Sequence, residues 1–215
     1  MAKYVLLTGF EAFGGERINP SELVVRNLDG RTVAGRTIRA RVFPVHAGHV
    51  AAHLDDAITE AAPDLVVCLG QAIGRPAIAL ERAAVNKLDF SQPDNAGSIP
   101  KDLPVLPGGA HSLPSTLPLD AILSAWTAHD VPAYISESAG TYVCNQVFYQ
   151  LQARDAGSDS AMVSGFVHLP CLPVQAISAG ADRTPSMPLA MMIRAIEILV
   201  ATTVPWMERR RAMAV

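Results

Sequence analysis

Cys144 is the best candidate for a nucleophile, because its neighbours place it at the start of a helix. A predicted strand at 133–137 ends before an Ala-Gly-Thr turn, and Val143, Val147 and Leu151 then follow at helical spacing. The free N–H groups and the dipole at a helix N-terminus favour an anion, so a thiol there can ionise below its ordinary pKa of about 8.5. Backbone N–H groups at such a turn also suit an oxyanion. The alternative is a small core residue, since free cysteines are often buried.

His168 could act as the matching base. It closes a predicted buried strand at 161–168 and is followed by Leu169 and Pro170. Ligands bind at the carboxyl ends of the strands in open α/β sheets, and near-neutral titration suits a base that later serves as an acid. The alternative is a core histidine hydrogen-bonded to the backbone. The other histidines lie in loop or helix-surface contexts: His46, His49, His53, His111 and His129.

Glu81 interrupts an apolar strand pattern at 78–85. A carboxylate at such a position must be paired or hydrogen-bonded, because an isolated buried charge is costly. It could therefore orient an imidazole and stabilise its protonated form, which is the third role in a nucleophile–base–orienter set. The alternative is a structural network between Glu81 and its neighbour Arg82.

The number and spacing of the cysteines indicate a reducing compartment and do not indicate a second catalytic or metal site. Three cysteines are an odd and sparse set, which argues against a disulfide framework and for a reducing environment. Cys171 is a weaker nucleophile candidate than Cys144, since it lies between Pro170 and Pro173 without a helix N-terminus. The absence of Cys-x-x-Cys makes a structural metal site unexpected.

Short apolar runs that alternate with helical patterns must position these side chains. The alternation predicts an α/β fold with three layers around a mostly parallel, twisted sheet. Proline and glycine punctuate residues 86–118, which predicts a long irregular binding loop, lid or oligomer contact. Strands are expected at 4–8, 37–43, 65–69, 78–85, 133–137 and 161–168, and helices at 19–30, 51–61, 119–127, 142–154 and 189–203, the last ending before Pro205.

The bulk composition fits one domain, residues 1–215, with 50% hydrophobic and 17% charged residues. The net charge is −3, and acidic and basic residues are mixed along the chain. The sequence therefore lacks the basic stripe that nucleic-acid binding needs. The N-terminus leads directly into a predicted strand, and the longest uncharged stretch contains prolines, so we expect a cytoplasmic protein with no membrane association. A mean hydropathy of +0.24 suggests that some apolar surface is covered by another subunit.

Several segments, in this order and spacing, resemble the pyroglutamyl peptidase I (pyrrolidone carboxyl peptidase) family of cysteine peptidases. The resemblance covers nearly the whole chain, and its ordered set of motifs is highly specific. Those segments are 8–15 (TGFEAFGG), Asn19-Pro20, Gly70-Gln71, Glu81-Arg82, Asn86, Pro93-Asp94-Asn95, 139–145 (AGTYVCN) and 165–170 (GFVHLP).

The resemblance implies a cysteine exopeptidase that removes N-terminal pyroglutamyl residues from peptides. Its α/β/α sandwich would need no cofactor and would assemble as a homodimer or homotetramer. Cys144 would be the nucleophile, His168 the acid/base and Glu81 the residue that holds the imidazole. The lactam pocket would be lined by Phe10, Phe13, Tyr142 and Val143, with Gln71 and Asn19 as polar contacts.

The chain departs from the family pattern at Ser91-Gln92, where members commonly carry Arg-Ile, and at Tyr142, where phenylalanine is more usual. The lost arginine and aliphatic residue leave two further hypotheses open. One is a related thiol amidase with a different acyl specificity. The other is an inactive scaffold of the same fold.

Overall fold

The computed structural model describes residues 4–155, 162–178 and 184–213, which form a seven-stranded sheet with helices on both faces. The order of strands in the sheet is β2-β3-β1-β4-β9-β5-β8, and β6 and β7 form a separate pair. The strands are β1 (Tyr4–Phe10), β2 (Thr32–Val33), β3 (Arg36–Phe43), β4 (Leu65–Gln71), β5 (Ile78–Glu81), β6 (Ala83–Val85), β7 (Ser112–Pro114), β8 (Ala133–Ser136) and β9 (Val163–Leu169). The helices are α1 (Pro20–Leu28), α2 (Val50–Ala61), α3 (Leu119–Ala128), α4 (Val143–Asp155), α5 (Pro173–Ser178) and α6 (Leu189–Met213).

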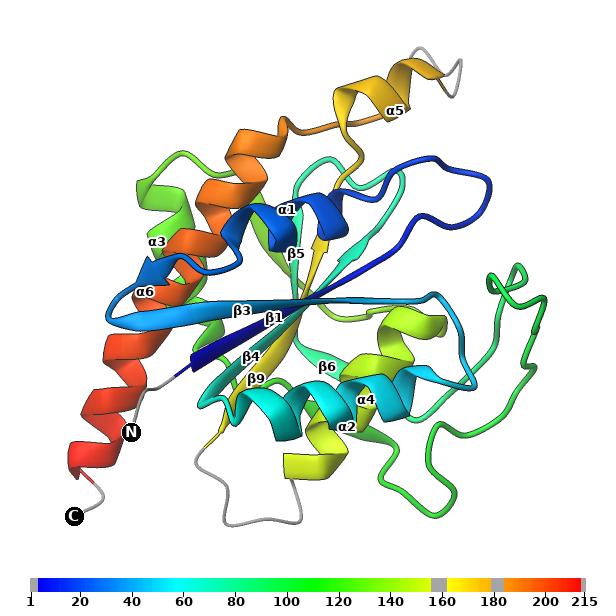
Figure 1. The fold of residues 1–215 in the computed structure, drawn as a ribbon, viewed down its shortest axis with the longest axis horizontal. Coiled ribbons are helices and arrows are strands. Elements are labelled where there is room, and N and C mark those ends of the chain that lie inside the picture. The colour runs from blue at the N-terminus through cyan, green and yellow to red at the C-terminus, as the bar shows by residue number, and fades with distance from the viewer. Residues whose placement is uncertain (1–3, 156–161, 179–183, 214–215) are drawn as a thin grey trace.

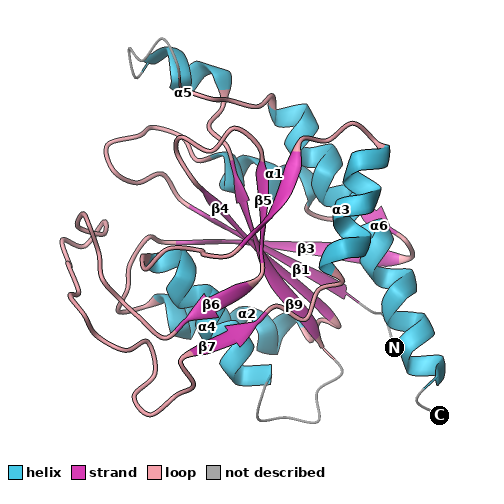
Figure 2. Cartoon of the chain, turned by 180° about the vertical axis from the view of Figure 1, so that it is seen from behind, coloured by secondary structure: helices cyan, strands magenta, loops and turns pink. Residues whose placement is uncertain are grey.

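Alternate residues of the central strands supply two separate cores. In β1, Val5 and Leu7 pack under α1, α3 and α6, whereas Leu6 and Phe10 pack under α2 and α4. The two helical layers lie on opposite sides of the twisted sheet in Figure 1, and Figure 2 gives the same arrangement from behind. The predicted three-layer α/β/α sandwich is therefore confirmed. Strand β4 is buried along its whole length, as a strand covered on both faces must be.

Most neighbouring strands are parallel, and one exception shapes the site. Strands β3, β1, β4 and β9 run the same way, so their carboxyl ends share an edge. Strand β5 is antiparallel to β9, with Ala79 opposite His168 and Leu80 opposite Val167. Glu81 and His168 consequently lie diagonally across the two strands on one face, within reach of each other's side chains.

The strand expected at 78–85 is wrong in one respect, because the chain leaves the main sheet after Glu81. Ala83–Val85 forms β6 and pairs with β7 instead. The break sits at Arg82, whose N–H donates to the Ser136 carbonyl and whose own carbonyl accepts from Ser115 N. The apolar alternation continues through the break, so periodicity alone does not reveal it. The 86–118 segment is largely irregular as predicted, apart from β7 and a bridge between Leu88 and Leu103.

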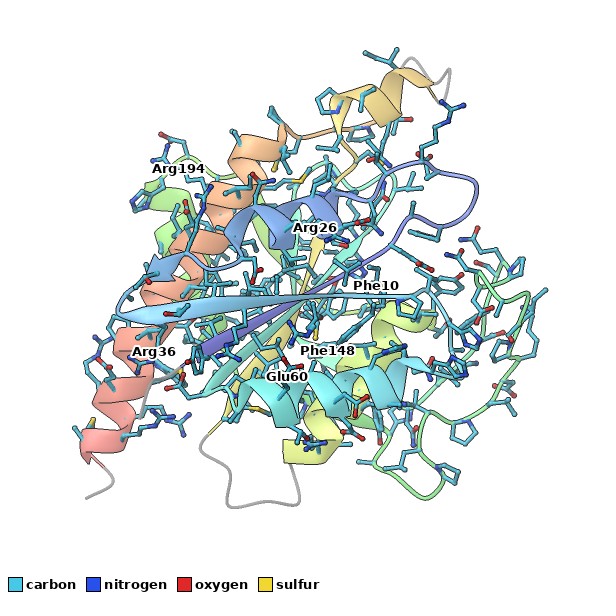
Figure 3. The ribbon with its side chains drawn as sticks, in the orientation of Figure 1. Phe10, Arg26, Arg36, Glu60, Phe148 and Arg194 are labelled. Carbon is cyan, nitrogen blue, oxygen red and sulfur yellow. The ribbon has the colours of Figure 1, made fainter. Side chains whose placement is uncertain are left out.

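The prediction that Pro205 ends the last helix is also wrong, since α6 continues to Met213. A proline inside a helix removes one hydrogen bond and costs about 3 kcal/mol. Packing offsets this cost, because Val204 and Met207 are buried on either side of the proline. Beyond it, Glu208 pairs with Arg36 at 3.0 Å, and Figure 3 labels Arg36 beside the lower half of α6.

Helix α6 is also the one described helix that is long and apolar enough to cross a membrane by length and composition. Its apolar face has a partner within the protein. Met192, Ile196, Leu199 and Val200 are fully buried, and α6 packs against α1, α3 and β2. The Trp126 indole on α3 donates to the Ala195 carbonyl at 2.8 Å, which fixes the two helices together. The composition of α6 is therefore accounted for by the core of the domain.

The end of β1 and the start of α1 are held in unusually close contact. Asn19 caps α1 by accepting from Ser21 N, as the Asn-Pro sequence predicts, and the Ser21 hydroxyl accepts from Phe10 N at 3.0 Å. Glu22, in the first turn of the helix, pairs with Arg26 at 2.8 Å. A Cβ on Gly9 would lie 2.6 Å from the Ser21 carbonyl oxygen, so only glycine allows this approach.

We predict that Gly9→Ala lowers the free energy of unfolding by about 1–3 kcal/mol or more, because the clash is with backbone that cannot rotate away. Urea unfolding of the purified variant measures this. Gly48→Ala is the matched control, since its added methyl would come no closer than 3.2 Å to any other atom, and that atom belongs to the His46 side chain. Equal losses for the two variants would contradict the prediction.

Candidate active site

Glu81 and His168 form a buried pair at the edge of the sheet. The Nδ1 atom of His168 lies 2.7 Å from Glu81 Oε1, and the two residues are 4% and 0% exposed. A neutral imidazole that donates from Nδ1 leaves Nε2 as its basic nitrogen. The pair therefore has the geometry in which a carboxylate selects the tautomer of a base.

Cys144 lies in the first turn of α4, and its sulfur lies against Gly70 of β4, the strand that neighbours β9 and His168. A Cβ placed on Gly70 would come within 2.9 Å of the Cys144 sulfur, so that sulfur occupies the space which the glycine leaves open. Gly70 is in register with His168 across β4 and β9, and neighbouring strands are about 4.8 Å apart. The three candidates for a catalytic set thus converge, and Gly70 is a requirement of the site that sequence reasoning missed.

The electrostatics differ from the sequence-based expectation of an ionised thiol. Burial raises the pKa of the Cys144 thiol to about 12, and the Glu81 charge adds to this, while Arg75 and a backbone N–H oppose it. Burial also lowers the pKa of His168, against the raising effect of Glu81. At neutral pH the structure therefore favours a neutral thiol beside a neutral imidazole. Such a pair can still react if the imidazole takes the proton as the sulfur attacks.

Glu81 is paired with a different arginine from the one that the structural alternative considered. Arg82 pairs with Glu137 on the surface at 2.8 Å, so the Glu81–Arg82 network considered above is not present. Arg75, in the loop between β4 and β5, instead places Nη1 2.6 Å from Glu81 Oε1. No local pattern around Arg75 signals this contact, because it depends on where the antiparallel strand β5 is inserted.

An apolar pocket opens beside the thiol. It borders all six residues expected to line a pocket, together with Cys144 and Val45. Its walls are mainly aromatic: the Tyr142 ring lies 6.0 Å from that of Phe13 and 4.3 Å from that of Phe90, measured between centroids. Val45 was not among the predicted residues, and Phe90 packs against Tyr142 without bordering the pocket. The six expected residues are Phe10, Phe13, Asn19, Gln71, Tyr142 and Val143.

Two amide side chains at the pocket differ in how they are used. Asn19 is committed to structure, since its Oδ1 caps α1 and its Nδ2 donates to the Glu11 carbonyl at 2.9 Å. Gln71 donates from Nε2 to the Cys171 sulfur at 3.4 Å, while its Oε1 is buried with no hydrogen-bond partner among the described residues. A buried acceptor without a partner is costly, so Gln71 is poised for a donor from a ligand.

Two positions that depart from the family pattern, Gln92 and Tyr142, lie close together, and Tyr142 borders the pocket. The Tyr142 hydroxyl donates to the Pro93 carbonyl at 2.9 Å, which satisfies the group that phenylalanine would lack. Gln92 lies close to both Gly14 and the Tyr142 hydroxyl. Within the described ranges, no three His, Cys, Asp or Glu side chains are grouped so that they could hold a metal ion.

Comparison with known proteins agrees with this geometry. The family model for pyroglutamyl peptidases matches residues 3–205. The chain belongs to the pyroglutamyl peptidase family. Its relatives include the pyrrolidone-carboxylate peptidases of Chromobacterium violaceum, 47% identical over 81% of each chain, and of Pyrococcus furiosus, 39% identical over 91% of this chain and 95% of that one.

Solved structures of pyroglutamyl peptidases share the fold. A mutant of the Pyrococcus furiosus pyrrolidone carboxyl peptidase superposes with a TM-score of 0.91 at 38% identity, covering 94% of this chain and 98% of that chain. Pyroglutamyl peptidase I of Bacillus amyloliquefaciens gives 0.89 at 34% identity, covering 94% and 96%. The three-layer architecture is therefore that of the family.

We predict that iodoacetamide at neutral pH modifies Cys144 before the other two cysteines. Cys144 opens onto the pocket beside an imidazole that can accept its proton, whereas Cys68 and Cys171 are buried. Burial raises the pKa of Cys68 and of Cys144 alike to about 12, so access and the neighbouring imidazole set the order of reaction. Mass spectrometry of the labelled peptides measures the order of reaction. Modification of Cys68 in the folded protein at the same rate would contradict the prediction.

The pH dependence of that reaction should follow His168. Protonated His168 cannot accept the thiol proton, and because its pKa is lowered from 6.5, the protonated form accumulates only below that pH. The rate of Cys144 alkylation should therefore persist at pH 6.5 and fall as the solution is made more acidic. Stopped assays across pH 4.5–8 test this expectation, and an acid midpoint above about pH 7 would refute it.

Proposed function

We propose that this protein is a cysteine exopeptidase that hydrolyses the amide bond after an N-terminal pyroglutamyl residue of a peptide. The observation that carries the proposal is the aromatic pocket beside Cys144 with one unmatched amide oxygen, that of Gln71. A pyroglutamyl ring has apolar faces and a single N–H donor, so it would fill the pocket and supply the donor that Gln71 lacks. Membership of the pyroglutamyl peptidase family supports the same reaction.

The same pocket would reject ordinary N-termini. A peptide ammonium placed between Phe13 and Tyr142 would lose its hydration without gaining an anionic partner there. Desolvating an unpaired charge costs several kcal/mol, whereas the neutral lactam avoids this cost. Selectivity would therefore come from what the pocket lacks as much as from what it offers.

The proposed reaction proceeds by acyl transfer. Cys144 loses its proton to Nε2 of His168 as its sulfur attacks the pyroglutamyl carbonyl, and Glu81 stabilises the imidazolium through Nδ1. Backbone N–H groups at the start of α4 are suited to the oxyanion. His168 then protonates the leaving amine, and a thioester remains on Cys144. His168 next takes a proton from water, whose oxygen attacks the thioester carbonyl. The C–S bond then breaks, His168 returns the proton to the Cys144 sulfur, and pyroglutamate is released.

Three further features belong to the proposal. Residues 1–215 act as one catalytic domain, without a cofactor, on pyroglutamylated peptides in the cytoplasm. The chain assembles as a homodimer or homotetramer. Exposed apolar side chains in the long 86–118 segment are consistent with a covered surface, namely Ile99, Leu103 and Leu106.

The direct test is release of a fluorophore from a pyroglutamyl amide by the purified protein. Cys144→Ala should lower kcat by roughly 10⁴-fold or more, because the nucleophile is lost. Cys171→Ser is the matched control and should keep most of the activity, since a hydroxyl can still accept from Gln71. Activity that survives Cys144→Ala, or wild-type protein that cleaves a prolyl amide as fast as a pyroglutamyl amide, would contradict the proposal.

A further inference from the structure

Arg75 connects the buried carboxylate to the segment that carries the nucleophile. Its Nη1 lies 2.6 Å from Glu81 Oε1 and 3.3 Å from the Ser136 hydroxyl, and its Nη2 donates to the Ser138 carbonyl at 3.0 Å. Ser136 ends β8, and Ser138 lies in the turn that leads into α4 and Cys144. One planar guanidinium therefore bridges three parts of the site, which a lysine ammonium would do less well.

The contact with Glu81 is on the oxygen that also holds His168. Oε1 receives both the Arg75 and the His168 nitrogens, whereas Oε2 is buried without a partner among the described residues. Two donors converging on one oxygen fix the rotation of the carboxylate about its last bond. If the guanidinium were absent, the carboxylate would keep only the imidazole as a donor, so its rotation and the orientation of the imidazole would be less firmly fixed.

Arg75 is outside the pocket and does not border the space where a substrate would bind. Its side chain is 24% exposed, while the Glu81 side chain is fully buried. An arginine that gives up hydration to reach a buried carboxylate, with two further acceptors arranged around it, is built for that contact. The Arg75–Glu81 pair is not an ordinary ion pair on the protein surface, because the Glu81 side chain is not exposed to solvent.

We propose that Arg75 is a positioning residue, which holds Glu81 against His168 and couples this pair to the turn that carries Cys144. The inference rests on the proposed peptidase function for its effect on turnover. Its effect on thiol reactivity does not depend on any substrate.

The charge of Arg75 has a predictable effect on titration. His168 is faced by Glu81 from β5 and by Arg75 from the β4–β5 loop, and Cys144 by these two and by Cys68 from β4. The Arg75 cation lowers the pKa of both His168 and Cys144. Its removal raises both, so the acid limb of any reaction that needs the neutral imidazole or the thiolate moves to higher pH.

The test compares Arg75→Gln and Arg75→Lys with Arg82→Gln. Arg82 is the matched control, as a neighbouring arginine in an exposed pair with Glu137. Arg75→Gln should lower kcat on a pyroglutamyl amide by roughly 10–100-fold, leave KM within about twofold, and shift the acid limb upward. Arg75→Lys keeps the charge but loses the three-way bridge, so its acid limb should stay near wild type while kcat falls. Arg82→Gln should match wild type in all three.

Alkylation of Cys144 by iodoacetamide, followed against pH in the same variants, separates this proposal from the peptidase function. An upward shift in Arg75→Gln, in a protein that cleaves no pyroglutamyl amide, would refute the function and support the positioning role. An alkylation profile in Arg75→Gln that matches wild type would overturn the positioning role, even if turnover fell. If Arg75→Gln does not fold, Arg75→Lys decides, and a wild-type kcat in that variant overturns the proposal.

Discussion

The proposed active site depends on keeping one carboxylate inside the protein. Glu81 is fully buried, and an unpaired charge there would cost several kcal/mol. Two donors, from His168 and Arg75, compensate for this cost on a single oxygen. The insertion of β5 antiparallel to β9 makes the arrangement possible, because it sets Glu81 diagonally opposite His168. The electrostatics of the site are thus a consequence of strand direction.

Burial shifts the pKa of both the Cys144 thiol and the His168 imidazole toward their neutral forms. Enclosure disfavours both charged forms, so an ion pair between Cys144 and His168 is not the resting state that the structure supports. The helix N-terminus then has its greatest effect on the charge that develops during attack. A site that is neutral before reaction also keeps the aromatic pocket beside it free of strong fields, which suits an uncharged ring.

The sequence predicts the layers and the approximate places of Cys144 and His168, because both sit at boundaries between elements that local patterns mark. The resemblance to a family predicts the pocket residues, and all six border one cavity. Three features could not be predicted locally. Arg75 meets Glu81 only through the topology of β5, the break after Glu81 is hidden by continuing apolar alternation, and α6 passes Pro205 because packing on both sides outweighs propensity.

Asn19 links the start of α1 to the pocket in a way that limits how the protein can change. Its amide caps the helix, fastens the loop at Glu11 and forms part of the cavity wall. The helix cap and the shape of the cavity wall therefore depend on one side chain, so a substitution at Asn19 changes both. A lineage that reshapes this wall must first find another way to begin the helix, which makes the polar corner of the cavity slower to diversify than its aromatic side.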